Sequence, residues 1–185
     1  MIISLPFLNR RTAVTWGDFR MSFEQKGEEV PIQQQILLLH YLQGAWASEG
    51  VVSSGEWISF QEVPDGRFYI DAFQRRAKVP LIQAFGSKPE QLPTAASEIY
   101  NALPFDRGDF SAVVQVLPLV PVALVLWKGD EEFPPEGNIL FDRTICRLLS
   151  AEDIAWLAGM VVYPLIGNVK NPVRKHGASS IEEAI

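Results

Sequence analysis

The chain has 185 residues, of which 48% are hydrophobic and 21% are charged, and a chain of this length can bury about two-thirds of its unfolded surface in one core. Its 16 basic and 22 acidic residues give a net charge of −6, which opposes binding to nucleic acid or to an anionic membrane surface. We expect one globular domain over residues 1–167 and a polar, flexible tail over residues 168–185. A single cysteine, Cys146, excludes an internal disulfide and favours a cytoplasmic location.

No segment predicts an export signal or a membrane-spanning helix. The apolar amino terminus precedes the basic pair Arg10-Arg11, which is the wrong order for a signal peptide. The apolar run over residues 113–127 contains Pro118 and Pro121, and it is shorter than the ~20 residues that a spanning helix needs. We therefore expect no membrane insertion.

The first third of the chain predicts a hairpin followed by a helix. Two runs of alternating apolar residues, 13–16 and 19–23, flank Gly17, which can take the positive φ angle of a tight turn. Pro31 suits the first turn of a helix, and apolar residues recur at helical spacing over residues 32–46. Because apolar residues surround most of this helix, we expect it to lie at the centre of the fold.

The middle of the chain predicts a second hairpin and then a helix. Residues 57–63 and 68–70 are typical of strands, and the Pro-Asp-Gly sequence at residues 64–66 is a strong turn signal. Asp71 can cap the helix that follows. Pro80 has no amide hydrogen and should kink or restart this helix.

The rest of the chain alternates helices with very apolar strands. A helix over residues 90–103 precedes strands over residues 110–117 and 120–127, and the second strand is apolar on both faces, which predicts a position inside the sheet. Ser150 and the carboxylate three residues later resemble a capping box, which predicts a helix over residues 150–166. The pattern predicts an α+β fold: one domain with a mainly antiparallel twisted sheet and covering helices.

Three consecutive carboxylates, Asp130, Glu131 and Glu132, form the most prominent local chemical signal. They follow the end of an apolar strand, and Asp142 ends the next apolar run. Together these side chains could supply oxygen ligands for Mg²⁺ or Ca²⁺. The more ordinary alternative is a solvated acidic turn in which one carboxylate accepts hydrogen bonds from backbone amides. We assign no metal, and we retain the four carboxylates as candidates for ligand binding.

A second group of candidates combines a carboxylate, arginines and tryptophans. Glu62 shares its predicted strand face with apolar residues, so its carboxylate should point to the core and pair with Arg75 or Arg76. A structural ion pair is the expected outcome, and an acid or base with a raised pKa is the alternative. Trp57 and Trp127 lie at strand ends near acidic residues, where an indole can stack on a ligand, although core packing is the commoner role.

The other reactive side chains form no catalytic motif. The only histidines are His40 and His176, which excludes the HExxH metalloprotease motif, and no Gly-x-Ser-x-Gly sequence accompanies them. We expect His40 to be a core or boundary residue with a local hydrogen bond. Cys146 lies between Arg143 and Arg147, but an inert buried thiol is the expected state.

Several sequence blocks between residues 30 and 165 are characteristic in combination. They comprise residues 36–42, 55–60, Glu62, Phe73, Arg76, 127–134 and 140–142. On these blocks the chain resembles a bacterial and archaeal family of domains of unknown function, DUF3786. The resemblance implies a frequent association with a small iron–sulfur domain, of the type also found in corrinoid and electron-transfer proteins of anaerobes. Because a cubane cluster needs about four thiolates, we expect no intrinsic cluster with Cys146 alone. Any redox role would have to come through a partner protein that carries the redox centre or through a bound ligand.

These observations lead to three hypotheses of function. The first is a non-catalytic module that binds a ligand or a partner protein and is accessory to anaerobic redox or corrinoid metabolism. The link to this metabolism rests on the resemblance alone. The second is an enzyme that uses Glu62 and the 130–132 cluster, with or without a divalent metal. The third is a structural oligomer. An enzyme requires these carboxylates to meet in one cleft, whereas a binding module requires an exposed apolar patch or an aromatic pocket.

Overall fold

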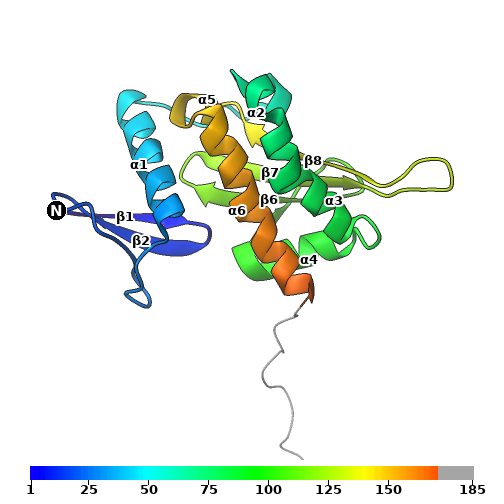
Figure 1. Ribbon diagram of the computed structural model, residues 1–185, viewed down its shortest axis with the longest axis horizontal. Helices are drawn as coiled ribbons and strands as arrows, with labels where there is room; N and C mark the ends of the chain where they lie inside the picture. Colours follow the sequence, from blue (N-terminus) through cyan, green and yellow to red (C-terminus); the bar gives the residue numbers. More distant parts are fainter. Residues whose placement is uncertain (171–185) are drawn as a thin grey trace, which may run out of the picture.

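Two antiparallel sheets and six helices form an α+β fold in the computed structural model, which describes residues 1–170 (Figure 1). The strands are β1 (Ile2–Phe7), β2 (Arg10–Thr15), β3 (Met21–Phe23), β4 (Trp57–Ser59), β5 (Leu103–Pro104), β6 (Phe110–Leu117), β7 (Val120–Trp127) and β8 (Glu136–Asp142). The helices are α1 (Ile32–Ala47), α2 (Gly66–Phe73), α3 (Val79–Phe85), α4 (Gln91–Tyr100), α5 (Ile145–Leu148) and α6 (Ala151–Lys170). A 3₁₀ turn covers Phe60–Glu62, and a π-helical turn covers Gln74–Lys78. The predicted fold class is therefore confirmed.

The larger sheet contains the strands that periodicity predicts best. Its order is β4-β8-β7-β6-β5, and the smaller sheet has the order β1-β2-β3. The bounds of β6 and β7 match the predicted strands, and β7 occupies the predicted interior position. A backbone hydrogen bond from Leu8 to Val116, 2.9 Å long, joins the β1–β2 turn to β6. Strand β1 was not predicted, because its short apolar sequence has no clear alternation.

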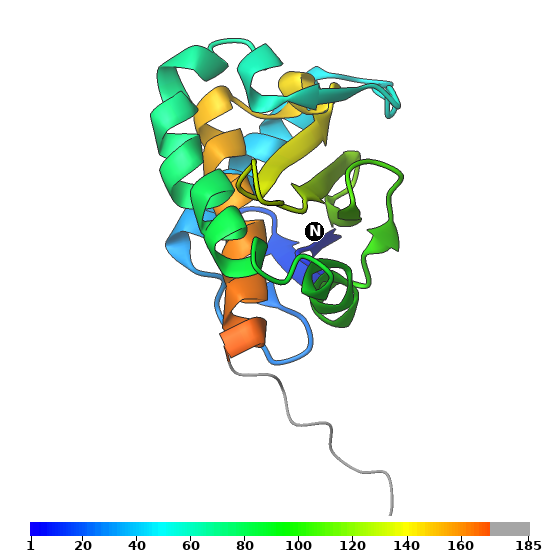
Figure 2. The ribbon, with the colours of Figure 1, turned by 90° about the vertical axis from the view of Figure 1, so that its right-hand side faces the viewer.

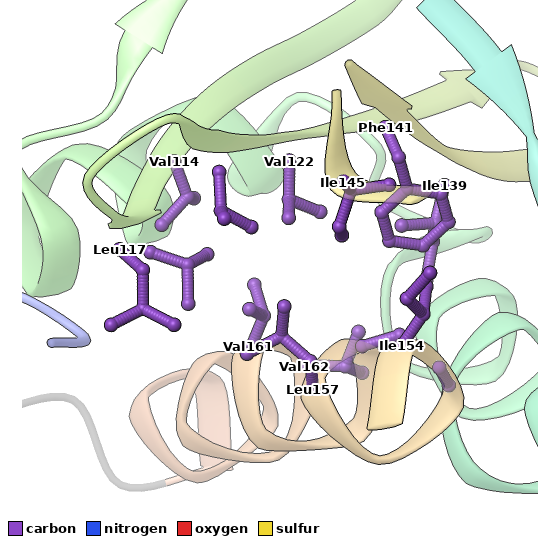
Figure 3. Packing of buried hydrophobic residues seen from close by; sticks show 14 of the residues in the cluster. Val114, Leu117, Val122, Ile139, Phe141, Ile145, Ile154, Leu157, Val161 and Val162 are labelled. Atoms are coloured by element: carbon purple, nitrogen blue, oxygen red, sulfur yellow. The ribbon is translucent and has the colours of Figure 1, made fainter. Parts of the chain in front are cut away.

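Helix α6 covers one face of the larger sheet and packs at the centre of the core. Figure 2 shows α2, α3 and α6 on the same side of this sheet. In Figure 3, side chains of α6 point toward side chains of β6, β7 and β8. The labelled residues of this contact are Ile154, Leu157, Val161 and Val162 on α6, and Val114, Leu117, Val122, Ile139 and Phe141 on the strands; all are fully buried. This burial of branched apolar side chains is the main source of stability at the centre of the fold.

The predicted central position of the helix over residues 32–46 is wrong. Helix α1 lies at the edge of the molecule, and α6 occupies the centre (Figure 1). Only Leu37, Leu38 and Tyr41 of α1 are buried. The apolar residues on its other faces remain partly exposed.

The second predicted hairpin is also wrong. Only Trp57–Ser59 pairs with β8, and residues 68–70 belong to α2, whose N-cap is Asp65 at a φ angle of 60°. The chain leaves the sheet because Ser59 and Glu62 form a capping box that closes the 3₁₀ turn. Core packing then favours the helix, since Phe60 stacks on Phe73 of α2 with ring centroids 4.3 Å apart.

The start of α6 follows the predicted capping pattern. The Ser150 hydroxyl donates to the Asp153 carboxylate over 2.6 Å, and the backbone amide of Asp153 donates to the Ser150 oxygen over 3.2 Å. The helix continues to Lys170, and the rest of the predicted tail, including His176, lies outside the described residues. Within residues 1–170, no helix combines the length and the hydrophobicity that crossing a bilayer would require.

Candidate functional site

A surface groove lies where α6 meets the π-helical turn and the start of α1. Its volume is about 490 Å³, within the range of small-molecule sites. The groove is lined by Leu8, Gln34, Arg76, Trp156, Gly159, Met160, Tyr163 and Pro164; we call it the α6 groove. A neighbouring hollow of about 280 Å³ shares Trp156 with it and includes Ile36, His40 and Asp153. The two hollows make this face of the α1–α6 junction concave.

A cation and an aromatic ring form the polar end of the α6 groove. The guanidinium carbon of Arg76 lies 4.2 Å from the centroid of the Trp156 ring, a distance at which a cation–π interaction is favourable. Among the described residues, Arg76 forms no ion pair with a carboxylate. Its N–H donors therefore remain available to an anionic ligand.

The walls of the groove combine an apolar surface with one buried polar atom. Trp156 is 40% exposed and Tyr163 is 56% exposed, so part of each side chain is accessible to a bound molecule. The Oε1 atom of Gln34 is buried and accepts no hydrogen bond in the described structure. A buried acceptor without a donor costs free energy, so a ligand with an N–H or O–H group would gain by pairing with it.

Glycine at position 159 allows α6 to approach the π-helical turn. A Cβ atom placed there would lie 3.3 Å from the carbonyl oxygen of Arg76, which is closer than an ordinary van der Waals contact. The close approach brings the backbone of Arg76 against α6 and so helps to place its side chain over Trp156. The base of the groove thus depends on Gly159.

His40 and Asp153 form a hydrogen-bonded pair in the neighbouring hollow. The His40 Nδ1 atom lies 2.8 Å from the Asp153 carboxylate, which also accepts the hydroxyl of Ser150. In a serine hydrolase the histidine stands between the serine and the aspartate, whereas here the aspartate stands between the other two. The arrangement therefore caps α6 and activates no nucleophile. His40 is about half exposed, so it lies at the boundary and not in the core, and its hydrogen bond is made to a residue distant in the sequence.

Glu62 lies on the surface rather than in the core, contrary to the prediction. Its carboxylate accepts hydrogen bonds from the Ser59 amide at 2.8 Å and the Ser59 hydroxyl at 2.9 Å. These bonds lower the pKa of Glu62 below its usual value. Its ion-pair partner is Arg143 at 3.9 Å, and not Arg75 or Arg76. The carboxylate holds the 3₁₀ turn in place.

The three consecutive carboxylates lie in a loop that projects from the far end of β7 and β8 (Figure 1). The Asp130 carboxylate accepts the backbone amides of Glu132 at 2.9 Å and Phe133 at 2.8 Å, and these bonds lower the pKa of Asp130. Glu131 and Glu132 are exposed. Within residues 1–170, no three histidine, cysteine or acidic side chains come together as a potential metal site.

Asp142 lies at the opposite end of β8 and is buried. Its Oδ1 atom accepts the amides of Ser54 and Thr144 and the Ser54 hydroxyl, and its Oδ2 atom accepts the Gly55 amide and the Ser53 hydroxyl. Burial alone would raise the pKa of Asp142, but the hydrogen bonds from Ser53, Thr144 and Ser54 outweigh it and hold the pKa well below its usual range. This carboxylate fastens the 53–55 loop to the sheet.

The two tryptophans selected from the sequence lie outside the α6 groove. Trp57 packs against Phe105, with ring centroids 4.8 Å apart, next to a small buried cluster formed by Ala123, Val125 and Leu140. Trp127 is partly exposed at the end of β7, where the acidic loop begins. Neither indole lines the α6 groove or the neighbouring hollow.

Arg76 is the one sequence-selected candidate that lines the α6 groove. The aromatic residues of the groove, Trp156 and Tyr163, were missed. Their seven-residue separation places them on one face of α6 together with Met160. This face differs from the one that contacts the sheet, so a second apolar stripe along the helix was the available signal.

The fold and the groove together define an α+β domain with an open aromatic cleft and no recognisable catalytic constellation among the described residues. The sequence model of the family described as "Domain of unknown function (DUF3786)" matches residues 2–163. The chain therefore belongs to this family, which confirms the resemblance. Comparison with curated proteins and comparison with solved structures each gave no match.

Proposed function

We propose that this protein is a non-catalytic binding module whose α6 groove holds a flat, apolar group that carries a negative charge. The observation that supports this proposal is the Arg76 guanidinium stacked 4.2 Å from Trp156 in an open groove, without a carboxylate partner among the described residues. The cation would bind the negative group, and the two exposed aromatic rings would contact the apolar part. A donor on the ligand would pair with Gln34.

The separation of the carboxylates supports binding over the enzyme hypothesis. Glu62 is held by Ser59, whose partner on β8 is Leu140. The acidic loop begins beside Glu136, four residues away along β8, which corresponds to about 13 Å along a strand. Acid–base chemistry on one substrate requires both groups within reach of it.

The natural occupant of the groove, in this proposal, belongs to a cytoplasmic partner protein that carries a redox centre or takes part in corrinoid metabolism. This description of the partner rests on the family resemblance. The groove itself fits any occupant of the stated chemistry, whether a cofactor group or an acidic side chain beside an aromatic one. The chemistry of the groove can therefore be tested before the partner is known.

The test uses two fluorescent dyes that differ in charge. Anilinonaphthalene sulfonate combines an aromatic body with an anion, and N-phenylnaphthylamine is its uncharged relative. We expect the native protein to bind the sulfonate dye and Arg76→Gln to weaken this binding about tenfold, since a hydrogen bond to a charged group contributes about 1.5–3 kcal/mol. Binding of the uncharged dye should change less than about threefold, and Trp156→Leu should weaken both dyes.

The matched control is Arg75→Gln, which removes the same charge from the same turn. Arg75 is exposed and does not line the groove, so its substitution should leave both affinities unchanged. Thermal unfolding by circular dichroism must show that each variant remains folded, because the sulfonate dye also binds loosened proteins. Equal losses for Arg75→Gln and Arg76→Gln, or no binding by the native protein, would contradict the proposal.

A further inference from the structure

Helix α1 carries an apolar stripe that no other described residue covers. The side chains of this stripe are Ile32, Ile36, Leu39 and Trp46, which are between 38% and 89% exposed. They lie apart from Leu37, Leu38 and Tyr41, which fasten α1 to the rest of the protein. Figure 1 shows α1 at the edge of the molecule, where a second protein could reach it. Trp46 is the most exposed of the four.

The spacing of the stripe matches the seam of a coiled coil. Together with Gln43, its members stand at intervals of four, three, four and three residues along α1. This alternation repeats every seven residues and is the pattern by which two helices pack side by side. In this register Gln43 and Ile36 are equivalent positions, and Ile32, Leu39 and Trp46 form the other set. We call these five residues the α1 seam.

We propose that the α1 seam pairs with the α1 seam of a second copy of this chain, with the two helices parallel. Residues 32–47 contain no aspartate, glutamate, lysine or arginine. A seam that selects a different partner usually carries charges on its flanks, whereas an uncharged seam allows two copies to meet without repulsion although each copy carries −6. The proposal does not depend on the function of the α6 groove.

Gln43 supports the parallel arrangement. Two parallel helices related by a two-fold axis place each seam residue opposite its own copy. The amide of Gln43 has both donors and an acceptor, so it can form hydrogen bonds with the same amide in the other copy. A single polar residue within an apolar seam sets the register of such pairs. An antiparallel pair that overlaps along the whole of α1 would instead place Gln43 opposite the apolar Ile36.

The size of the seam predicts a concentration-dependent dimer. Helix α1 has 16 residues and is about 24 Å long. Trp46 can contribute on the order of 200 Å², but one pair of short helices covers less than the roughly 800 Å² per partner of a standard interface. Monomer and dimer should therefore both be observable when the protein concentration is varied.

The test is sedimentation velocity of the full chain over a wide range of concentrations. The mass should rise from 20.7 kDa toward twice this value. Leu39→Glu places two negative charges opposite each other, so the dissociation constant should increase at least tenfold. Phe68→Glu is the control, because Phe68 is an exposed apolar residue on α2, outside the seam; this variant should dimerise like the unmodified chain.

Cross-linking tests the direction of the helices. In a Cys146→Ser background, Gln43→Cys should form a disulfide-linked dimer under mild oxidation, and Glu98→Cys on α4 should not. A native chain that stays monomeric at all concentrations, or a dimer that Leu39→Glu leaves intact, would overturn the proposal. A dimer that Leu39→Glu breaks but Gln43→Cys does not link would overturn the parallel arrangement. Circular dichroism confirms that each variant is folded.

Discussion

The buried carboxylate of Asp142 offers the sharpest test of how this fold is held together. It accepts five hydrogen bonds, three of them from the backbone amides of Ser54, Gly55 and Thr144. The substitution Asp142→Asn keeps the shape of the side chain but replaces one acceptor oxygen with a donor group. Serine hydroxyls can rotate and accept a hydrogen bond, whereas a backbone amide can only donate.

The cost of this substitution follows from which oxygen is replaced. If the amide group takes the place of Oδ2, the Gly55 amide loses its acceptor. If it replaces Oδ1, the Thr144 amide loses its acceptor, and the Ser54 amide keeps only its hydrogen bond to the Thr144 hydroxyl. One buried amide without a partner costs about 1–3 kcal/mol, and the remaining hydrogen bonds weaken when the acceptor loses its charge. Part of this loss of stability is offset because a neutral amide costs less free energy to bury than a charged carboxylate. We expect the free energy of unfolding to fall by about 2–4 kcal/mol.

The pH dependence of the free energy of unfolding distinguishes the effect of the Asp142 charge from the effect of its side-chain shape. Because the pKa of Asp142 is lowered in the folded protein, the unfolded state takes up the proton first as the pH falls. The carboxylate therefore contributes its full stability above about pH 4, the usual aspartate value, and loses it as the pH falls toward the folded pKa. The difference in the free energy of unfolding between the native protein and Asp142→Asn should therefore become smaller below about pH 4.

Urea unfolding followed by circular dichroism at neutral and acidic pH measures both effects. Asp71→Asn is the matched control, because the Asp71 side chain is exposed, and it should change the free energy of unfolding by less than about 0.5 kcal/mol. A loss for Asp142→Asn below about 1 kcal/mol at neutral pH would refute the reasoning. The reasoning would also be refuted if the two proteins differed in their free energy of unfolding as much at about pH 3 as at neutral pH.

Three further predictions concern packing and reactivity. Gly44→Ala should lower the free energy of unfolding by at least about 2 kcal/mol, because the new Cβ atom would clash with the backbone carbonyl of Leu148; Gly167→Ala, at an open position of α6, should raise it by about 0.5–1 kcal/mol, and thermal melts compare the two. Tyr100→Phe removes a hydroxyl that donates over 2.9 Å to a carbonyl of α6, so urea unfolding should reveal a loss of about 1 kcal/mol. Burial raises the pKa of the Cys146 thiol against the opposing charge of Arg143, so dithionitrobenzoate should react with Cys146 more slowly at neutral pH than with the thiol of the urea-unfolded chain.

The sequence predicted the elements whose apolar periodicity fits only one type of secondary structure. Strands β6 and β7 are long runs of branched apolar residues, and α6 begins with a capping pair and repeats its apolar residues at helical spacing. Residues 68–70 were misassigned because three apolar residues fit either a strand or a helix. The stacking of Phe60 on Phe73 decides in favour of the helix, and this contact does not follow from local pattern.

The candidate site was harder to predict because it depends on which surfaces remain uncovered. The carboxylates of Glu62, Asp130 and Asp142 are conspicuous in the sequence, but each accepts hydrogen bonds from nearby amides or hydroxyls. Trp156 and Tyr163 lie in a helix that has apolar residues on several faces. The sequence pattern does not show which of these faces the rest of the fold leaves uncovered.

Pro80 affects both the secondary structure and the candidate site. It has no amide hydrogen to donate to the carbonyl of Arg76 four residues earlier, and the sequence therefore predicted a kink or a restart of the helix. The π-helical turn, in which the Val79 amide donates to the Gln74 carbonyl, separates α2 from α3 at this point, and α3 restarts at Val79 with Pro80 in its first turn. Such wide turns often occur at functional sites. Here the turn packs its Arg76 carbonyl against Gly159 and places the Arg76 side chain over Trp156. The residue that marks a helix break in the sequence thus helps to position the cation of the α6 groove.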